Sequence, residues 1–335
     1  MSNMISEELL FLSEQDVREL LTVEDAIQAA ESAFYHIGTG DIQVGPMSLM
    51  MLDATGTNNF HALPAVLWDK KVAGLKWIST FGNPQPGYPF SHGNLVVLNH
   101  TDTGSPFAIV GATAITAMRT AGGHGVVQAK HLANPDPKTL TVFGCGAQAK
   151  AGIRGFLFQF PSIRQVRVFS RSKGPVEQVT AEHQGRAEVI CCSSPSEALE
   201  GSNLVLVVSG AVSPLLTADM LRPGMTIIGI EGFRDIDAEI SRRAKWFLGY
   251  RPPDMDIIED PELNPDGTLS VHDVFGDLTE VLTGKIPGRE SPDEIIVSTH
   301  MGMGAHDLNC AYLVYLRARE QGRGIPLPLN QWEPL

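Results

Sequence analysis

The stretch TLTVFGCGAQA at residues 139–149 is a short apolar run that passes through two glycines into a helical pattern. A strand that leads through G-x-G-x-x-A into a helix is the pattern of a dinucleotide-binding turn. Gly144 permits the tight turn, and Gly146 lets the backbone approach a pyrophosphate because no Cβ intervenes. Ala149 lets the helix pack closely on the sheet. A structural glycine-rich turn gives the same letters, so the surrounding sequence decides between the two.

The segments after this stretch alternate between strand and helix patterns. The predicted strands are QVRVFS (165–170), AEVICC (187–192), NLVLVVS (203–209) and MTIIGI (225–230). Helical patterns in AKAGIRGFLFQF (149–160) and SPSEALEGS (194–202) lie between them. This alternation predicts an α/β fold with a doubly wound parallel sheet of the Rossmann type.

Cofactor contacts are expected where the strands end. Ala147 and Gln148 open the helix whose N-terminus offers free N–H groups and partial positive charge to the phosphates. Ser209 and Ile230 end two later strands and are further candidates for cofactor contact.

The end of the second strand bears on which dinucleotide binds. An NAD-specific site usually ends this strand with Asp or Glu, which holds the ribose 2′-OH. Here the strand runs into Ser170, Arg171, Ser172 and Lys173, so no carboxylate is present. Arg171 is suited to pair with a 2′-phosphate, beside the two hydroxyls. The alternative is a solvated charge cluster at a strand end. We favour NADP(H) over NAD(H).

The composition restricts the class of protein. The 335 residues are 43% hydrophobic and 19% charged, as in a globular rather than a disordered chain. A formal net charge of −13 argues against nucleic acid and anionic membranes as partners. We find no secretion-signal pattern and no apolar run of the roughly 18 residues that span a membrane. The four cysteines have neither CxxC nor zinc spacing and are expected to be reduced, so we expect a cytoplasmic protein.

The region before the glycine turn has other patterns. Residues 14–36 show helical periodicity, with Thr22 and Asp25 spaced close to a capping box. Short runs over about 44–110, separated by turn residues, predict an antiparallel β region.

Two further helices are predicted. One covers about 111–132 and is interrupted by Gly122 and Gly123, and an amphipathic one covers 306–324 near the end of the chain.

Several segments together resemble the ornithine cyclodeaminase/μ-crystallin family. In the family's order they are AGLKW (73–77), FGNPQPGYP (81–89), DTGSP (102–106), ITAMRTA (115–121), GCGAQA (144–149), SPSEALEGSN (194–203) and GMGAHDLNCAYLVY (302–315). They span most of the chain, and ITAMRTA followed by GxGxQA after a strand is the most specific pair.

The resemblance implies a homodimer with two domains per chain. Residues 1–125, completed by a C-terminal helix at 305–335, would form an α/β substrate-binding and dimerisation domain, and residues 126–304 a Rossmann dinucleotide-binding domain. Members move a hydride between a nicotinamide and the α-carbon of an amino or imino acid. Together with the NADP(H) preference inferred from the end of the second strand, the resemblance implies an NADP(H)-dependent oxidoreductase, either an imine or ketimine reductase or an amino-acid dehydrogenase.

Three residues in the first predicted domain carry this expectation. Lys76 and Arg119 match family positions that bind the substrate carboxylate, and Thr120 is expected to reach a cofactor phosphate. Arginine recognises a carboxylate bidentately, and lysine adds charge or exchanges a proton with an imine. Apart from the resemblance, Lys76 reads as an exposed strand-end lysine and Arg119 as one half of a helix-surface ion pair.

Three departures from the family bear on the substrate. Met47 stands where the family commonly has a carboxylate-binding arginine, and His61 where ornithine cyclodeaminases have an acid. Glu231 is the nearest candidate for the catalytic aspartate of the late Rossmann strand, and the alternative for it is a loop carboxylate paired with Arg234. These departures weaken ornithine as the substrate.

Two other functions stay open. One is a true ornithine cyclodeaminase, an ammonia-lyase that converts ornithine to proline with bound NAD. The other is a non-catalytic NADPH-binding protein of the crystallin-like kind.

Four other residues have simpler interpretations. His300 and His306 either face the nicotinamide or cap the last helix, and His124 is a packing residue. Asp307, near the start of that helix, is expected to be structural. No cluster has metal-ligand spacing, so we expect no metal.

Overall fold

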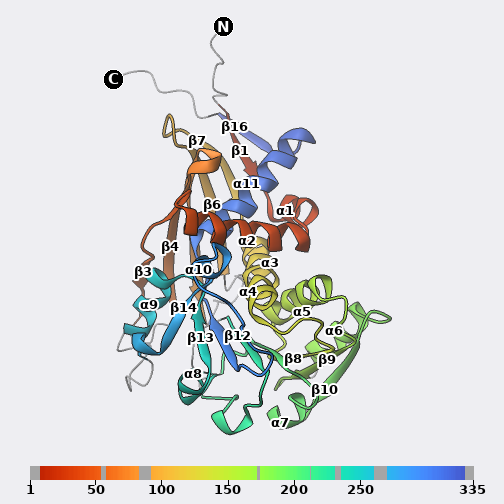
Figure 1. Cartoon of the computed structure of the whole chain (residues 1–335). Coiled ribbons are helices and arrows are strands. Elements are labelled where there is room, and N and C mark those ends of the chain that lie inside the picture. Colours follow the sequence, from red (N-terminus) through yellow and green to blue (C-terminus); the bar gives the residue numbers. More distant parts are fainter. Residues whose placement is uncertain are drawn as a thin grey trace. The chain divides into compact units, whose positions relative to one another are not determined.

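The computed structural model describes residues 8–53, 58–82, 92–171, 174–211, 213–230, 235–259 and 270–328. The chain forms two compact units (Figure 1). The first unit comprises Met1–Ala29, Thr39–Arg119 and Met303–Leu335, and the second unit comprises Ala30–Gly38 and Thr120–Gly302. The functions expected for the two predicted domains stay predictions.

The first unit is built on an eight-stranded sheet in the order β16-β1-β7-β6-β5-β4-β2, with β3 paired to β4. Its strands are β1 (Glu8–Leu12), β2 (Ile42–Val44), β3 (Ser48–Met51), β4 (Asn58–Leu67), β5 (Val72–Phe81), β6 (His92–His100), β7 (Pro106–Gly111) and β16 (Ile325–Pro328). Its helices are α1 (Glu14–Leu20), α3 (Thr113–Arg119), α11 (Gly304–Glu320), part of α2 (Val23–Thr39) and a 3₁₀ turn at Trp68–Lys70. Strands β2 to β7 pair antiparallel, which confirms the predicted antiparallel region.

Helix α11 packs against the sheet of the first unit (Figure 1). Side chains alternate between the two faces of a strand, so Leu63, Lys76 and Val96, which are paired across β4, β5 and β6, share one buried face. Gly304 brings α11 close to this face, because a Cβ there would lie 2.3 Å from the carbonyl oxygen of Leu63. The last helix of the chain therefore lies on the same face of the sheet as Lys76.

The second unit contains a sheet of eight parallel strands in the order β10-β9-β8-β11-β12-β15-β13-β14, which confirms the predicted doubly wound sheet. The strands are β8 (Thr139–Phe143), β9 (Gln165–Phe169), β10 (Glu188–Cys192), β11 (Leu204–Val207), β12 (Thr226–Gly229), β13 (Lys245–Leu248), β14 (Val274–Asp277) and β15 (Ile296–Thr299). The helices are α4 (Gly125–Leu132), α5 (Ala147–Gln159), α6 (Gly174–Glu182), α7 (Pro195–Ala198), α8 (Glu239–Arg243), α9 (Arg251–Glu259) and α10 (Leu278–Leu282), with 3₁₀ turns at Ala218–Met220 and Val271–Asp273.

Helices cover both faces of this parallel sheet. On one face, Val205 packs in a common core with Ala198 of α7 and Ile240 of α8. On the other face α5 lies close to the sheet, because a Cβ on Gly152 would be 2.5 Å from the Leu206 side chain. Strands buried on both faces explain why their sequences are continuous apolar runs rather than alternating patterns.

The helix predicted over 111–132 is interrupted at its glycines, as expected. It consists of α3, a π-helical turn at Thr120–His124 and α4. Gly122 lies in that turn, and a Cβ there would be 2.9 Å from the carbonyl oxygen of Ala151 in α5. The missing side chain thus allows the π turn and α5 to pack closely.

Local signals in the first residues are confirmed, but periodicity misses a later stretch. The capping box forms, because Thr22 N donates to the Asp25 carboxylate at 2.8 Å and Asp25 N donates to Thr22 Oγ1 at 3.2 Å. Periodicity assigns no element between Glu239 and Leu282, where the structure has α8, β13, α9, β14 and α10. Strands of four residues are too short for a period to be recognised.

Cysteine and membrane features were also expected from the sequence. All four cysteines are free, with Cys145, Cys192 and Cys310 buried and Cys191 exposed, in agreement with the expected reduced thiols. Among the described helices, none is both long and apolar enough to cross a bilayer.

Candidate functional site

Lys76 and Arg119 both bind the carboxylate of Asp307. Lys76 Nζ donates to Asp307 Oδ1 at 2.8 Å, and Arg119 Nε donates to the same oxygen at 3.0 Å. The three side chains come from β5, the end of α3 and the first turn of α11, and all are buried. The alternative interpretations, an exposed strand-end lysine and a helix-surface ion pair, are therefore wrong.

This cluster of Lys76, Arg119 and Asp307 has two cations for one carboxylate. Desolvation and the charge of Arg119 lower the pKa of Lys76 to about 8, against the opposing effect of Asp307. Arg119 Nη1 is buried and makes no hydrogen bond within the described part of the chain. A carboxylate placed beside Arg119 would satisfy this nitrogen and balance the excess positive charge.

Of the two departures in the first unit, His61 lies on the same sheet face as this cluster and Met47 lies outside the strands. His61 in β4 is paired with Ile78, two residues along β5 from Lys76, and so shares the face of Lys76. Burial and the charge of Lys76 lower the pKa of His61, so the imidazole is neutral at pH 7. Met47 precedes β3 and is 40% exposed.

The glycine turn of the second unit has the geometry that a dinucleotide needs. Gly144 has a φ of +116°, and a Cβ there would lie 2.4 Å from the carbonyl oxygen of Val208, so only glycine fits. Gly146 is the N-cap of α5, and a Cβ there would meet nothing within 4 Å. The turn follows β8, which lies between β9 and β11 where the strand order reverses. Open space before a helix N-terminus at this position suits a pyrophosphate.

Thr120 and Gln148 lie beside the same turn. Gln148 Oε1 accepts a hydrogen bond from Ala121 N at 3.2 Å, which joins the first turn of α5 to the π turn. Thr120, adjacent to Ala121, is 5% exposed, and its Oγ1 makes no hydrogen bond to any described residue. A buried hydroxyl that lacks a partner beside a helix N-terminus suits a phosphate oxygen. The residues around the turn therefore fit a nicotinamide dinucleotide.

Three of the other candidate residues lie at the carboxyl edge of the parallel sheet. Ala147 is exposed in the first position of α5, Ser170 follows β9, and Arg171 is exposed next to it. Ser172 and Glu231 lie outside the described residues, so the role of Glu231 stays a prediction.

The last two candidates have protein partners at this edge. Ser209 N and Oγ both donate to Asp235 Oδ2, at 3.3 and 2.7 Å. Burial raises the pKa of Asp235. Ile230 is 1% exposed and packs towards Gly125 in α4, so its side chain belongs to the core. Sequence reasoning did not single out Asp235, because nothing in the spacing of IEGFRDIDAEI connects it to Ser209.

His300 also has a buried partner. Its Nδ1 lies 2.7 Å from Asp254 Oδ2, and its ring centroid lies 4.7 Å from that of His124. The N-cap of α11 is Met303, and no side chain caps it. The roles considered for His300 and His306 stay predictions, whereas His124 is fully buried, as expected for a packing residue.

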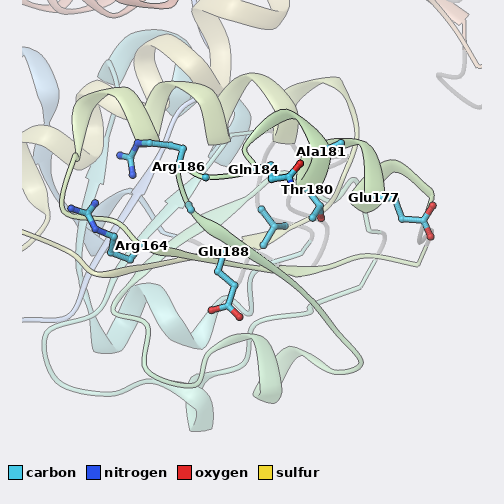
Figure 2. A pocket seen from close by; sticks show the side chains of 10 residues that line it. Arg164, Glu177, Thr180, Ala181, Gln184, Arg186 and Glu188 are labelled. Atoms are coloured by element: carbon cyan, nitrogen blue, oxygen red, sulfur yellow. The ribbon is translucent and has the colours of Figure 1, made fainter.

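A surface pocket lies elsewhere in the second unit. Figure 2 shows this cavity of about 750 Å³, lined by α6 and by residues just before or at the start of β9 and β10, including Arg164 and Glu188. These are the amino ends of the strands, opposite the edge that carries the glycine turn. Arg186, which also lines the pocket, donates to the carbonyl oxygens of Leu157 and Ile163 at 2.5 and 2.8 Å. The pocket is therefore not the candidate active site.

Comparisons with known proteins agree with this geometry. The profile of the ornithine cyclodeaminase/mu-crystallin family matches residues 7–322. Alanine dehydrogenase of Archaeoglobus fulgidus is 28% identical over 329 residues, which cover 95% of this chain and 97% of that protein. An archaeal alanine dehydrogenase dimer with bound NAD has a TM-score of 0.85 at 25% identity, covering 96% of this chain and 99% of that one. The Δ1-pyrroline-2-carboxylate reductase of Thermococcus litoralis, in complex with NADH and L-proline, has a TM-score of 0.84 at 25% identity, covering 95% and 100%.

Proposed function

The chain belongs to the ornithine cyclodeaminase/mu-crystallin family, and on that premise we propose that it is an NADP(H)-dependent oxidoreductase acting on a small imino or amino acid. The reaction interconverts the C=N bond of an α-imino acid and the C–N bond of the amino acid. The observation that carries this proposal is the buried cluster of Lys76, Arg119 and Asp307, which has one positive charge in excess. A substrate carboxylate supplies the missing negative charge.

Arg119 and Lys76 have different roles in the proposed reaction. Arg119 keeps Nε on Asp307 and binds the substrate carboxylate through Nη1. Lys76, with a pKa of about 8, is mostly protonated at pH 7 and donates a proton to the substrate nitrogen. When bound, the reduced nicotinamide supplies the hydride that the imine carbon accepts. Hydride and proton together reduce C=N to CH–NH.

Arg119 and Thr120 are neighbours in the chain. The chain passes from the first unit to the second between Arg119 and Thr120. The residue proposed for the carboxylate and the residue proposed for a cofactor phosphate are therefore consecutive.

The preference for NADP(H) rests on Arg171. It is exposed directly after β9, where an NAD-specific site has a carboxylate. The two solved relatives named above hold NAD or NADH, so this preference is a property proposed for this chain alone.

We also propose that the protein is a homodimer. Met50, Phe60, Trp77 and Leu95 lie on the face of the first sheet opposite Lys76, and the rings of Phe60 and Trp77 stack at 5.3 Å. Met50 and Leu95 are 43% and 41% exposed. An apolar sheet face of this kind suits a second copy of the chain.

Light scattering tests the homodimer and should give twice the mass of one chain. The double variant M50K/L95K should reduce the measured mass, whereas F158K on the surface of α5 should leave it unchanged.

The test of the enzymatic proposal is NADPH oxidation with cyclic imines that carry a carboxylate, and with 2-oxo acids plus ammonia. We expect turnover with at least one of them, and we expect R119M to abolish it while NADPH binding is retained. R154M is a matched control, because Arg154 pairs with Glu182 at the surface of α5. A folded protein that binds NADPH yet turns over no member of the panel would contradict the proposal.

A further inference from the structure

A row of three side chains lies next to the carboxylate cluster on the same face of the first sheet. His61, Ile78 and Asn94 are directly paired across β4, β5 and β6. Along each strand they lie two residues from Leu63, Lys76 and Val96, so they share the same face. His61 and Asn94 are two strand spacings apart, about 10 Å, with Ile78 between them. A substrate side chain that lies over Ile78 would have the imidazole on one side and the amide on the other.

The hydrogen bonds of Asn94 fix which way its amide points. Thr116 Oγ1 donates its proton to the carbonyl oxygen of Ala112 at 2.7 Å, so it receives a proton from Asn94 Nδ2, at 3.3 Å. Asn94 Oδ1 is thereby left as an acceptor. Asn94 is 7% exposed, and Oδ1 makes no hydrogen bond within the part of the chain that the structure describes. A buried acceptor of this kind is costly unless a donor reaches it.

His61 presents an acceptor as well. Its Nε2 lies 2.8 Å from Asn59 Oδ1, which can only accept, so Nε2 carries the proton. Because burial and Lys76 keep the imidazole neutral, Nδ1 has a lone pair rather than a proton. Both ends of the row thus offer an acceptor.

We propose that His61, Ile78 and Asn94 form the subsite for the substrate side chain and that it takes an uncharged hydrogen-bond donor, a hydroxyl or a carboxamide. This proposal rests on the proposed function, in which the substrate carboxylate lies at Arg119. The substrate class is then the 2-imino acids and amino acids with a hydroxyl or carboxamide side chain.

The charges around the row argue against an ammonium group, although ammonium is also a donor. On this face, the described residues of β4, β5 and β6 include no carboxylate. Asp307 belongs to the neighbouring cluster, where the charges of Lys76 and Arg119 together exceed its single negative charge. An ammonium ion on the row would be desolvated beside Lys76 with neutral acceptors only, which is unfavourable.

The unaltered protein gives the first test. L-norvaline, L-homoserine and L-2,4-diaminobutyrate have the same shape and end in a methyl, a hydroxyl and an ammonium group. With NADP⁺, and separately with NAD⁺, we expect kcat/KM for L-homoserine to exceed that for each of the other two by at least about fivefold. L-glutamine against L-glutamate distinguishes carboxamide from carboxylate in the same way. If kcat/KM for L-norvaline equals that for L-homoserine, or if L-2,4-diaminobutyrate has the highest value, the subsite is wrong and the proposed function stands. If the protein turns over none of the amino acids and imines, both the proposed function and the subsite are wrong.

Variants of Asn94 give the second test. N94L should remove the preference for L-homoserine over L-norvaline, and N94D should move the preference towards L-2,4-diaminobutyrate. N309L is the matched control, because Asn309 is also a buried asparagine of the first unit whose Oδ1 makes no hydrogen bond to a described residue, but it lies on α11 and not in the row. A preference that survives N94L, or that N309L removes equally, contradicts the role of Asn94.

Discussion

Lys76 Nζ lies 2.8 Å from Asp307 Oδ1, although the two residues are 231 positions apart in the chain. The same carboxylate oxygen accepts from Arg119 Nε at 3.0 Å. A single aspartate on the last long helix therefore holds both cations proposed to bind substrate.

Replacing Asp307 with Asn should weaken both catalysis and stability. Two buried cations would lose their partner, so we expect the free energy of unfolding to fall by about 3 kcal/mol. The pKa of Lys76 should fall further, because Asp307 now raises it. The activity for imine reduction should therefore be lost at a lower pH than in the unaltered protein. Urea unfolding and the pH profile of kcat/KM check the two effects, with N309D on the same helix as the control for added or removed charge.

In the unaltered protein, kcat/KM for imine reduction should fall at basic pH as Lys76 loses its proton. Reduction needs the protonated amine, so kcat/KM should fall as pH rises through about 8. The effect of Lys76 on stability has the opposite dependence on pH. Because the pKa of Lys76 in the folded state is lower than the ordinary lysine value of 10.5, the unfolded chain binds more protons from about pH 8 to 10.5, and the contribution of Lys76 to stability rises with pH there. In K76R the fall in kcat/KM should move above about pH 10. If the fall stays near pH 8, a group other than Lys76 causes it.

The two glycines of the turn should respond to substitution in different ways. G144A places a Cβ 2.4 Å from Val208 O at a positive φ, so it should lower the free energy of unfolding by about 2 kcal/mol. G146V meets nothing near its Cβ, so its melting temperature should stay within about 2 °C of the parent value. G146V should nevertheless raise the Kd for NADPH at least about tenfold, because the side chain fills the space in front of α5. If a fluorescence titration of G146V gives an unchanged Kd for NADPH, the cofactor phosphates do not bind in front of α5.

Arg171 should decide between the two coenzymes. R171A should raise the KM for NADPH about tenfold or more, as expected for loss of a charge-assisted pair, and leave the KM for NADH within about twofold. R154A is the control, because this exposed arginine pairs with Glu182. An equal rise for both coenzymes would show that Arg171 contacts a part that they share.

The sequence by itself determined the elements that rest on local rules. The parallel strands are continuous apolar runs, and the turn after β8 requires glycine at Gly144 because a side chain collides with Val208. The capping pair Thr22 and Asp25 spans three positions. Such signals depend on neighbours along the chain, so spacing alone reveals them. Lys76 and Arg119 were identified by resemblance, since an isolated lysine or arginine has no local signature of function.

Only the tertiary structure decided the electrostatics of the site. Sequence reasoning gave Asp307 a structural role at a helix end, and nothing in its spacing predicts that it holds Lys76 and Arg119. The same holds for Asn94, whose free acceptor depends on Thr116 and on strand register with His61. Charge, desolvation and hydrogen bonding act through space, and contacts between distant segments exist only once the chain has folded.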